Sequence, residues 1–261
     1  MARPAAKQRA ATSVVVSLPL WETLEPLLAL SGEADCTYLP GRLARSQGFL
    51  TEALNGATYR MLLDRGFRRS GRVIYRPSCR GYRECRQLRV PTATFAASRS
   101  QRRVLRRNRD LRVSIEPCRA TGEKWELYVR YLNSRHDDAM PRTTESFVDF
   151  LYNPCVESLD VCYRLDGRLI GVSVIDPVPG GWSSVYMYFD PAEARRSLGT
   201  YSVLWEIDHC REAGLAYYYL GFYVAGSRAM AYKARFAPHE LLREDGTWQQ
   251  VAEPVVERRA Y

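Results

Sequence analysis

The stretch "LDVCYRLDGRLIGVSVIDPVPGGWSSVYMYFDPAEARRSLGTYSVLWEIDHCREAGLAYYYLGF", residues 159–222, decides the fold of this chain. It opens with two apolar runs joined by Asp166 and Gly167, and an Asp-Gly pair between such runs strongly predicts a tight β-hairpin. A third strand is predicted over residues 182–190, where apolar and polar side chains alternate.

The rest of this stretch predicts that this third strand is followed by a helix and a further strand. Residues 199–215 carry apolar side chains at helical spacing, and Gly214 is placed to end that helix. Residues 216–222 form an apolar run that is typical of a buried strand. Antiparallel strands that lead into a strand–helix–strand unit predict an α+β fold, with a mixed sheet flanked by helices.

Weaker patterns surround this unit. Ser98 followed by Gln101 three residues later is the pattern of a capping box, which predicts a helix that begins at residue 99. Further elements are predicted by periodicity and stop signals: a helix ending at Gly66, strands over 72–77 and 111–117, and helices over 123–136 and 145–152.

Positive charge is concentrated in one segment. The chain of 261 residues has a formal net charge of +9, but residues 60–112 hold 17 Lys/Arg against three acidic residues, a local net charge of +14. Seven arginines fall within residues 98–112 alone. Because arginines at this density repel one another, the segment predicts a polyanionic partner rather than a packing role. A solvated basic face without a partner is the alternative.

Several classes of protein are not expected. No apolar stretch has the length of roughly 18 to 20 residues that a membrane-spanning helix needs. A short apolar run follows the basic start, but Pro19, Trp21 and Glu22 interrupt it, so we do not expect a signal peptide. Seven scattered cysteines in a chain of this size favour reduced thiols and a cytoplasmic location.

The order of the predicted elements resembles the acetyltransferase fold known as GNAT. In that superfamily a glycine-rich turn before the central helix cradles the diphosphate of coenzyme A. Here "RSLGTY" supplies Arg196, Gly199 and Thr200, but Tyr201 stands where a small residue is usual, and its side chain is expected to crowd the diphosphate. A coenzyme-A-dependent N-acetyltransferase is therefore disfavoured, although it stays an alternative.

Six stretches together resemble the aminoacyl-tRNA–protein transferases, and most closely the bacterial aspartate/glutamate leucyltransferases. They are "CTYLPGR" (36–42), "YRPSCRGYRECRQLRVP" (75–91), "SRSQRRVLRRNRDL" (98–111), "SLGTYSVLWEID" (197–208), "YYLGFYV" (218–224) and "MAYKARFAP" (230–238). The resemblance implies transfer of an aminoacyl group from charged tRNA to the N-terminal amine of a polypeptide that begins with Asp or Glu, in the N-degron pathway.

The donor and the acceptor are less well defined. Closeness to the bacterial branch favours leucine over arginine as the donor. The segment from Ala225 to Ala229 departs from the tract usual in the family, so a specialised peptide acceptor stays open. A protein that binds tRNA without catalysing transfer is a further alternative. The resemblance implies no cofactor beyond the charged tRNA, which is a substrate.

Binding residues follow from the chemistry of these substrates. An acidic acceptor side chain calls for a guanidinium, and Arg76 is the first candidate and Arg89 the second. Seven basic residues are expected to contact the tRNA, the last two at its acceptor end: Arg99, Arg102, Arg103, Arg106, Arg107, Lys233 and Arg235.

Aminolysis of an activated ester needs a positioned amine, a path for its proton and donors for the oxyanion. We expect these groups on the second-half sheet. Tyr186, Tyr188 and Asp190 alternate along one predicted strand, and Tyr219 and Tyr223 lie on or after the adjacent one. Asp190 is the candidate for the proton or the ammonium group, and the tyrosines are candidate donors. Packing of a sheet by aromatic residues is the alternative for each tyrosine.

Three cysteines correspond to a cluster common in the family, whose relatives have been associated with metal or iron–sulfur binding. Cys36, Cys79 and Cys85 are present, but Tyr82 occupies the middle position. A closed zinc site needs four ligands, so we expect no tightly bound metal and assign the three thiols to packing.

The predicted organisation has three parts: a disordered N-terminus over 1–15, a first half with the basic tRNA-binding helix over 16–118, and an aminoacyltransferase half over 119–261. The family resemblance implies that both halves are GNAT-like.

Overall fold

The fold is described from a computed structural model over residues 20–135 and 141–252. The predicted disordered segment, residues 1–15, lies outside them. The helices are α1 (Leu20–Leu24), η1 (Glu25–Leu27), α2 (Gly56–Asp64), α3 (Arg99–Arg107), α4 (Gly122–Arg135), α5 (Thr144–Phe147), η2 (Val148–Tyr152), η3 (Pro191–Arg196), α6 (Leu198–Glu212), α7 (Arg228–Ala231) and η4 (Tyr232–Arg235). The strands are β1 (Ala29–Leu30), β2 (Ala34–Asp35), β3 (Leu43–Ala44), β4 (Ser46–Leu50), β5 (Arg68–Ser70), β6 (Val73–Pro77), β7 (Arg86–Pro91), β8 (Arg112–Pro117), β9 (Leu159–Leu165), β10 (Arg168–Val178), β11 (Gly181–Phe189), β12 (Tyr217–Tyr223), β13 (His239–Leu242) and β14 (Trp248–Val251).

A mixed sheet of eight strands forms the centre of the molecule, in the order β14-β13-β7-β12-β11-β10-β9-β8. Its pairs are antiparallel except β11 and β12, which run parallel because α6 crosses over between them. The predicted α+β class with a mixed sheet flanked by helices is confirmed.

The hairpin of β9 and β10 confirms the turn read from the sequence. Asp166 has φ 49° and Gly167 has φ 84°, so both residues lie in the left-handed region that a two-residue turn of this kind requires. The pairing continues from Arg168 opposite Leu165 to Ile175 opposite Leu159, with an irregularity after Leu169.

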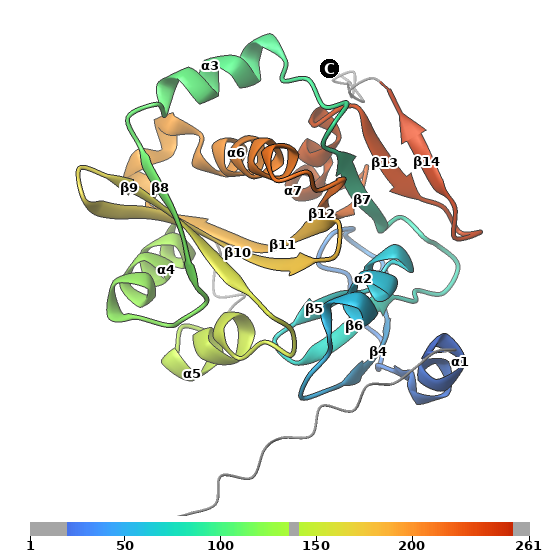
Figure 1. Ribbon diagram of the computed structural model, residues 1–261. Coiled ribbons are helices and arrows are strands. Elements are labelled where there is room, and N and C mark those ends of the chain that lie inside the picture. Colours follow the sequence, from blue (N-terminus) through green and yellow to red (C-terminus); the bar gives the residue numbers. More distant parts are fainter. Residues whose placement is uncertain (1–19, 136–140, 253–261) are drawn as a thin grey trace, which may run out of the picture.

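The two faces of this sheet carry different helices (Figure 1). On one face α6 buries Leu204 and Ile207, and α3 packs beside it. On the opposite face α4 and α5 cover an aromatic cluster that includes Tyr128 and Phe147. The sheet is thus buried on both faces, and β10 is buried along nearly all of its length.

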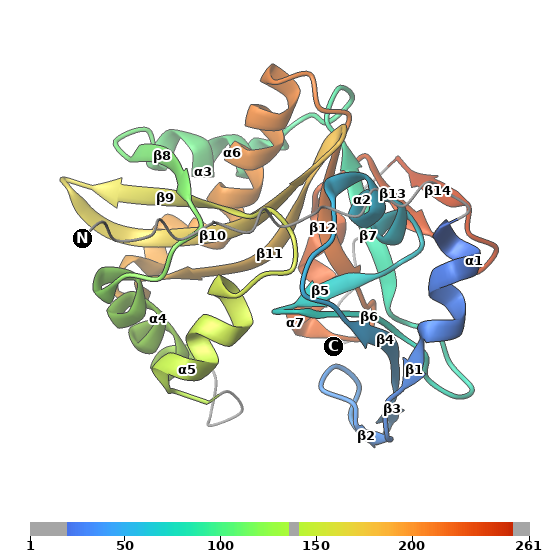
Figure 2. The same ribbon diagram turned by 60° about the horizontal axis from the view of Figure 1, so that its bottom comes forward.

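A second sheet, in the order β1-β4-β6-β5, lies with α2 against the large sheet (Figure 2). A buried ion pair joins the two sheets. The Arg69 guanidinium on β5 donates to both carboxylate oxygens of Asp176 on β10, each at 2.7 Å. Both side chains are fully buried. This ion pair fixes β5, and with it the neighbouring Arg68, against the large sheet.

The predicted elements are present with small shifts in their bounds. The helix predicted from residue 99 begins there as α3, and Ser98 and Gln101 form both bonds of the capping box. The helix predicted over 145–152 is instead a short α5 followed by a π-helical turn. Within residues 20–135 and 141–252, no helix combines the length and apolar character needed to cross a membrane.

Candidate active site

Strands β11 and β12 separate in the middle of the large sheet. They pair over only three residues each, from Gly181 opposite Tyr217 to Ser183 opposite Tyr219. Beyond that point β12 has an irregular register with β7, next to Gly221 at φ 89°. We call this place, between Ser184 on β11 and Gly221 on β12, the strand split.

Arg68 of β5 occupies the strand split. Its Nη2 donates a hydrogen bond to the Ser184 carbonyl. A Cβ at Gly221 would lie 2.7 Å from Arg68 Nη1, so the absence of a side chain there makes room for the guanidinium. Arg68 is only 8% exposed, and its buried Nη1 has no hydrogen-bond partner among the described residues.

A second buried cation lies on the β12 side of the split. Lys233 of η4 is 8% exposed and donates from Nζ to the Phe222 carbonyl at 2.7 Å. Burial, and after it the positive charge of Arg68, lower the pKa of Lys233 to about 7, while Cys85 acts in the opposite sense. Lys233 was expected to contact the tRNA from the surface. Because its side chain is buried, it does not reach the surface.

A pocket of about 350 Å³ opens beside the split, and we call it the arginine pocket. Phe222 is part of its wall, as is Gln87, which pairs with Phe222 across β7 and β12. Gln87 is 1% exposed, and neither polar atom of its amide has a partner among the described residues. The lining also includes seven charged residues, with arginines in excess: Arg65, Arg76, Arg83, Arg86, Arg243, Glu84 and Glu244.

Arg76 lines this pocket, and no carboxylate of a described residue is paired with its guanidinium. Its guanidinium donates to Gln47 Oε1 at 3.1 and 3.2 Å and to the Arg65 carbonyl at 3.3 Å. It stacks over the Phe67 ring at 4.6 Å. Burial lowers its pKa from the usual value, although Glu25 opposes this. Among the described residues Arg76 forms no ion pair, so its charge is available to an acidic ligand.

Arg89 is in the opposite situation. Its guanidinium donates to Glu240 at 2.6 Å and to Asp64 at 2.9 Å, and it stacks on Tyr217 and Trp248. Two carboxylates already neutralise it. The geometry therefore favours Arg76 over Arg89 as the group that meets an acidic acceptor.

Helix α3 presents its arginines to solvent. Its inner side packs Val104 and Leu105 against the core. Gln101 donates to the Arg235 carbonyl at 3.1 Å, and Asn108, the C-cap, donates to the Arg196 carbonyl at 2.9 Å. The five arginines predicted to bind tRNA, Arg99, Arg102, Arg103, Arg106 and Arg107, are all exposed, as is Arg235.

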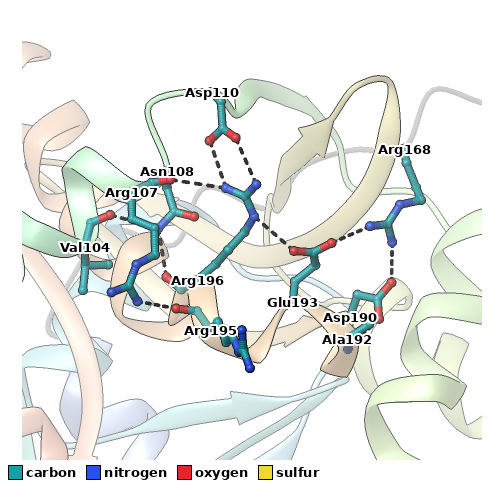
Figure 3. A network of polar contacts seen from close by, with 10 residues as sticks. All are labelled: Val104, Arg107, Asn108, Asp110, Arg168, Asp190, Ala192, Glu193, Arg195 and Arg196. Carbon is teal, nitrogen blue, oxygen red and sulfur yellow. Dashed lines mark hydrogen bonds and ion pairs between the residues drawn. The ribbon is translucent and has the colours of Figure 1, made fainter.

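A polar network attaches the end of α3 to the loop before α6 (Figure 3). Arg196 forms a two-pronged ion pair with Asp110, with both distances 2.9 Å, and a third bond to Glu193. Arg107 donates to the Arg195 carbonyl, so this arginine is partly committed to the fold. Tyr201 is 6% exposed with its ring against Tyr163, in the core rather than across the helix start. The structure gives Tyr201 a packing role and no role in crowding a diphosphate.

The predicted catalytic side chains are not gathered in one place. Tyr186 and Tyr188 face α4 and α5, where the Tyr188 hydroxyl lies 2.6 Å from that of Tyr152. Asp190 caps η3 and pairs with Arg168 at 2.5 Å. The other two candidates, Tyr219 and Tyr223, lie on β12. The Tyr219 hydroxyl donates to Asp64 at 2.5 Å, whereas Tyr223 belongs to the core under α6. Their catalytic roles stay predictions.

The three cysteines of the family's cluster lie near one another: Cys79 and Cys36 contribute to the raised pKa of Tyr82, and the same two thiols contribute, after burial, to the raised pKa of Cys85. The Tyr82 hydroxyl, at the middle position of the family's cluster, donates to the Leu43 carbonyl at 2.8 Å, and the Cys79 thiol donates to the Arg45 carbonyl. No group of three potential ligands suited to a metal occurs within the described ranges. We derive no step through such a group.

Arg68 and Gln87 were not identified from the sequence. In "GFRRSG" two arginines are adjacent, and because strand side chains alternate, they point to opposite sides. Nothing in the sequence distinguishes Arg69, which Asp176 neutralises, from Arg68, which has no such partner.

Comparisons with known proteins cover most of the chain. The N-terminal family model of arginine-tRNA-protein transferase matches residues 34–103, and the C-terminal model matches residues 123–243. The aspartate/glutamate leucyltransferase of Thiobacillus denitrificans is 43% identical over 84% of this chain and 92% of its own length. The enzyme of the same name from Hahella chejuensis is 38% identical over 82% of this chain and 92% of its own length.

Two solved structures are more distantly similar. L-PGS from Bacillus licheniformis has a TM-score of 0.45 and 11% identity, and the similarity covers 76% of this chain and 69% of that one. FemX has a TM-score of 0.42 and 10% identity, over 79% of this chain and 83% of that one.

Proposed function

The chain belongs to the arginine-tRNA-protein transferase family and is an aminoacyl-tRNA–protein transferase, and we propose that Arg76 selects its acidic acceptors. It transfers leucine from charged tRNA to the N-terminal amine of polypeptides that begin with Asp or Glu, as part of the N-degron pathway. The names of relatives at 38–43% identity support leucine as the donor. Since charged tRNA is the substrate, we expect the reaction in the cytoplasm.

Arg76 carries the assignment of the acceptor site. It is the half-buried arginine of the pocket that lies on the aromatic ring of Phe67 and is held by an amide oxygen of Gln47, so its position is fixed while its charge stays uncompensated. A guanidinium in this state binds a carboxylate through two parallel hydrogen bonds. The acceptor's Asp or Glu side chain then lies in the arginine pocket, and its amine points towards the ester.

Transfer is tested directly by mass spectrometry. The purified protein is incubated with tRNA charged with leucine or arginine and with peptides that begin with Asp, Glu, Lys or Ala. We expect a mass gain of one leucine on the Asp and Glu peptides only, and only with charged tRNA. A gain of arginine would reassign the donor, and binding of tRNA without any product would indicate a role in binding alone.

Arg76→Ala tests the selector. We expect kcat/KM for Asp- and Glu-initiated peptides to fall roughly 10- to 100-fold, the range expected for loss of a charged hydrogen bond, because the acceptor carboxylate loses its partner. Arg80→Ala is the matched control, since Arg80 is exposed and lies near Glu33 at 3.5 Å. If Arg76→Ala kept the wild-type kcat/KM for the Asp- and Glu-initiated peptides, Arg76 would not be the selector.

A further inference from the structure

Two adjacent arginines of β5 are buried in opposite electrostatic states. Arg69 is neutralised by Asp176 through two bonds of 2.7 Å. Arg68 has no ion pair with any described residue; one arm is fixed on the Ser184 carbonyl, and the buried Nη1 is left without a partner. A buried charge without a counter-charge is unfavourable for folding, so its retention indicates a ligand that supplies negative charge.

The position of Arg68 suits the reacting ester. The guanidinium lies between the edges of β11 and β12, at the point where they separate. Phe222 connects this place to the acceptor site, because it lines the arginine pocket while its carbonyl accepts from Lys233. An acceptor amine that enters from the pocket therefore approaches the split.

We propose that Arg68 binds the ester carbonyl oxygen of the aminoacyl-tRNA and stabilises the negative charge that this oxygen acquires during transfer. One free N–H arm fits a single oxygen atom, whereas a phosphate is better matched by the complete guanidinium fork. Lys233 adds positive potential from the β12 side. This inference rests on the proposed transfer reaction and names the group that serves its chemistry.

The step balances without any added reagent. The lone pair of the neutral amine attacks the ester carbon, and the electrons of the C=O double bond move onto the oxygen held by Arg68. The C=O bond then re-forms, the bond from carbon to the ribose oxygen breaks, and the proton lost by the amine passes to that oxygen. The products are a peptide bond and tRNA with a free terminal hydroxyl.

Arg68→Gln tests the proposal in the full-length protein, with Arg72→Gln as the control. Arg72 is an arginine of the same β5–β6 hairpin, but it is paired with Glu52 at the surface. The single-turnover rate of transfer and the Kd for uncharged tRNA are measured for each variant. We expect Arg68→Gln to lower the rate roughly 100- to 1000-fold, as loss of an oxyanion donor does, and to change the Kd less than about twofold. Arg72→Gln keeps both values.

Two results would overturn the assignment: a rate within a few-fold of wild type, or a loss of tRNA affinity as large as the loss of rate, which would place a phosphate at Arg68. Arg68→Lys covers the case in which Arg68→Gln does not fold. It keeps the charge but replaces the planar, two-armed guanidinium by a compact ammonium group on a flexible stem, so at least a tenfold lower rate is expected, and full activity contradicts the proposal. Absence of transfer by the wild type would instead refute the proposed function.

Discussion

Four arginines of the first half illustrate how neighbours decide what a residue does. Arg69 and Arg89 are neutralised by carboxylates and hold strands together. Arg76 and Arg68 lack an ion pair with any described residue; Arg76 lines the arginine pocket, and the buried Nη1 of Arg68 has no hydrogen-bond partner among those residues. The same side chain thus serves structure in two places, and we propose that it binds substrate in the two others.

A buried carboxyl under α6 gives a prediction at the same scale. Glu206 is 1% exposed and accepts from the hydroxyls of Tyr163, at 2.8 Å, and Tyr218. Burial raises its pKa to about 7, while the hydrogen bonds from the two tyrosines oppose this. Cys210 lies one turn further along the same helix, and in the described parts of the chain no cation is hydrogen-bonded to the carboxylate.

Since the folded protein holds the Glu206 proton more tightly than the unfolded chain, its contribution to stability is largest below about pH 4.5 and is lost as the pH rises to about 7. We expect this group to lower the free energy of unfolding by about 3 kcal/mol across that window. Glu206→Gln removes the titration while it keeps the shape. Urea unfolding at pH 5 and pH 8 should show a smaller difference for the variant, and identical differences would contradict the assignment.

Among the elements, α3 separates packing from binding most clearly. Gln101 and Asn108 hold one side of the helix to η4 and to the loop before α6. On the other side Arg99, Arg103 and Arg106 follow one another at spacings of four and three residues, and none forms a hydrogen bond or an ion pair with any described residue. The helix is therefore anchored by these polar contacts and by Val104 and Leu105, which pack against the core, and its arginine stripe is available to phosphates.

This stripe predicts a change in salt dependence. Arg103→Ala with Arg106→Ala should reduce the slope of log K against log salt for tRNA by about 1.4 to 1.8, because each lost phosphate contact releases one fewer counterion. The control is Arg119→Ala with Arg130→Ala, which removes the same charge elsewhere on the surface. Fluorescence titrations from 50 to 300 mM salt measure both slopes, and equal slopes for the two double variants would remove α3 from the interface.

On the scale of the whole molecule, one sheet joins the two halves of the chain. β7 comes from the first half but lies between β12 and β13 of the second, and it contributes the fully buried Leu88 and Val90. β8 likewise completes the edge beside β9. The division at residue 118 that was predicted from the sequence therefore stays a proposal that can be tested.

A fragment of residues 119–261 provides that test. Without β7 the strands β12 and β13 lose their shared partner, and the apolar core under α6 is exposed. We expect this fragment to show no cooperative thermal unfolding by circular dichroism when produced alone, and to recover it when it is co-produced with residues 1–118. A cooperative transition in the isolated fragment would establish an independent domain.

Local patterns were enough to determine most of the elements. The Asp166-Gly167 hairpin, the capping box at Ser98 and the long helix before Gly214 depend on interactions between residues close in sequence, so they could be predicted from the residues alone. The charge of residues 60–112 and the family motifs likewise pointed to charged tRNA, because electrostatic footprint and motif spacing are properties of the sequence.

The contents of the site were decided by tertiary structure alone. Arg76 and Arg89 look equivalent in the sequence, and only the fold brings Asp64 and Glu240 to Arg89 while it leaves Arg76 facing the pocket. Arg68 became a candidate only because β11 and β12 separate around it. The physical reason is that charge compensation and desolvation depend on residues far apart in the chain, and a linear pattern does not specify which of them meet.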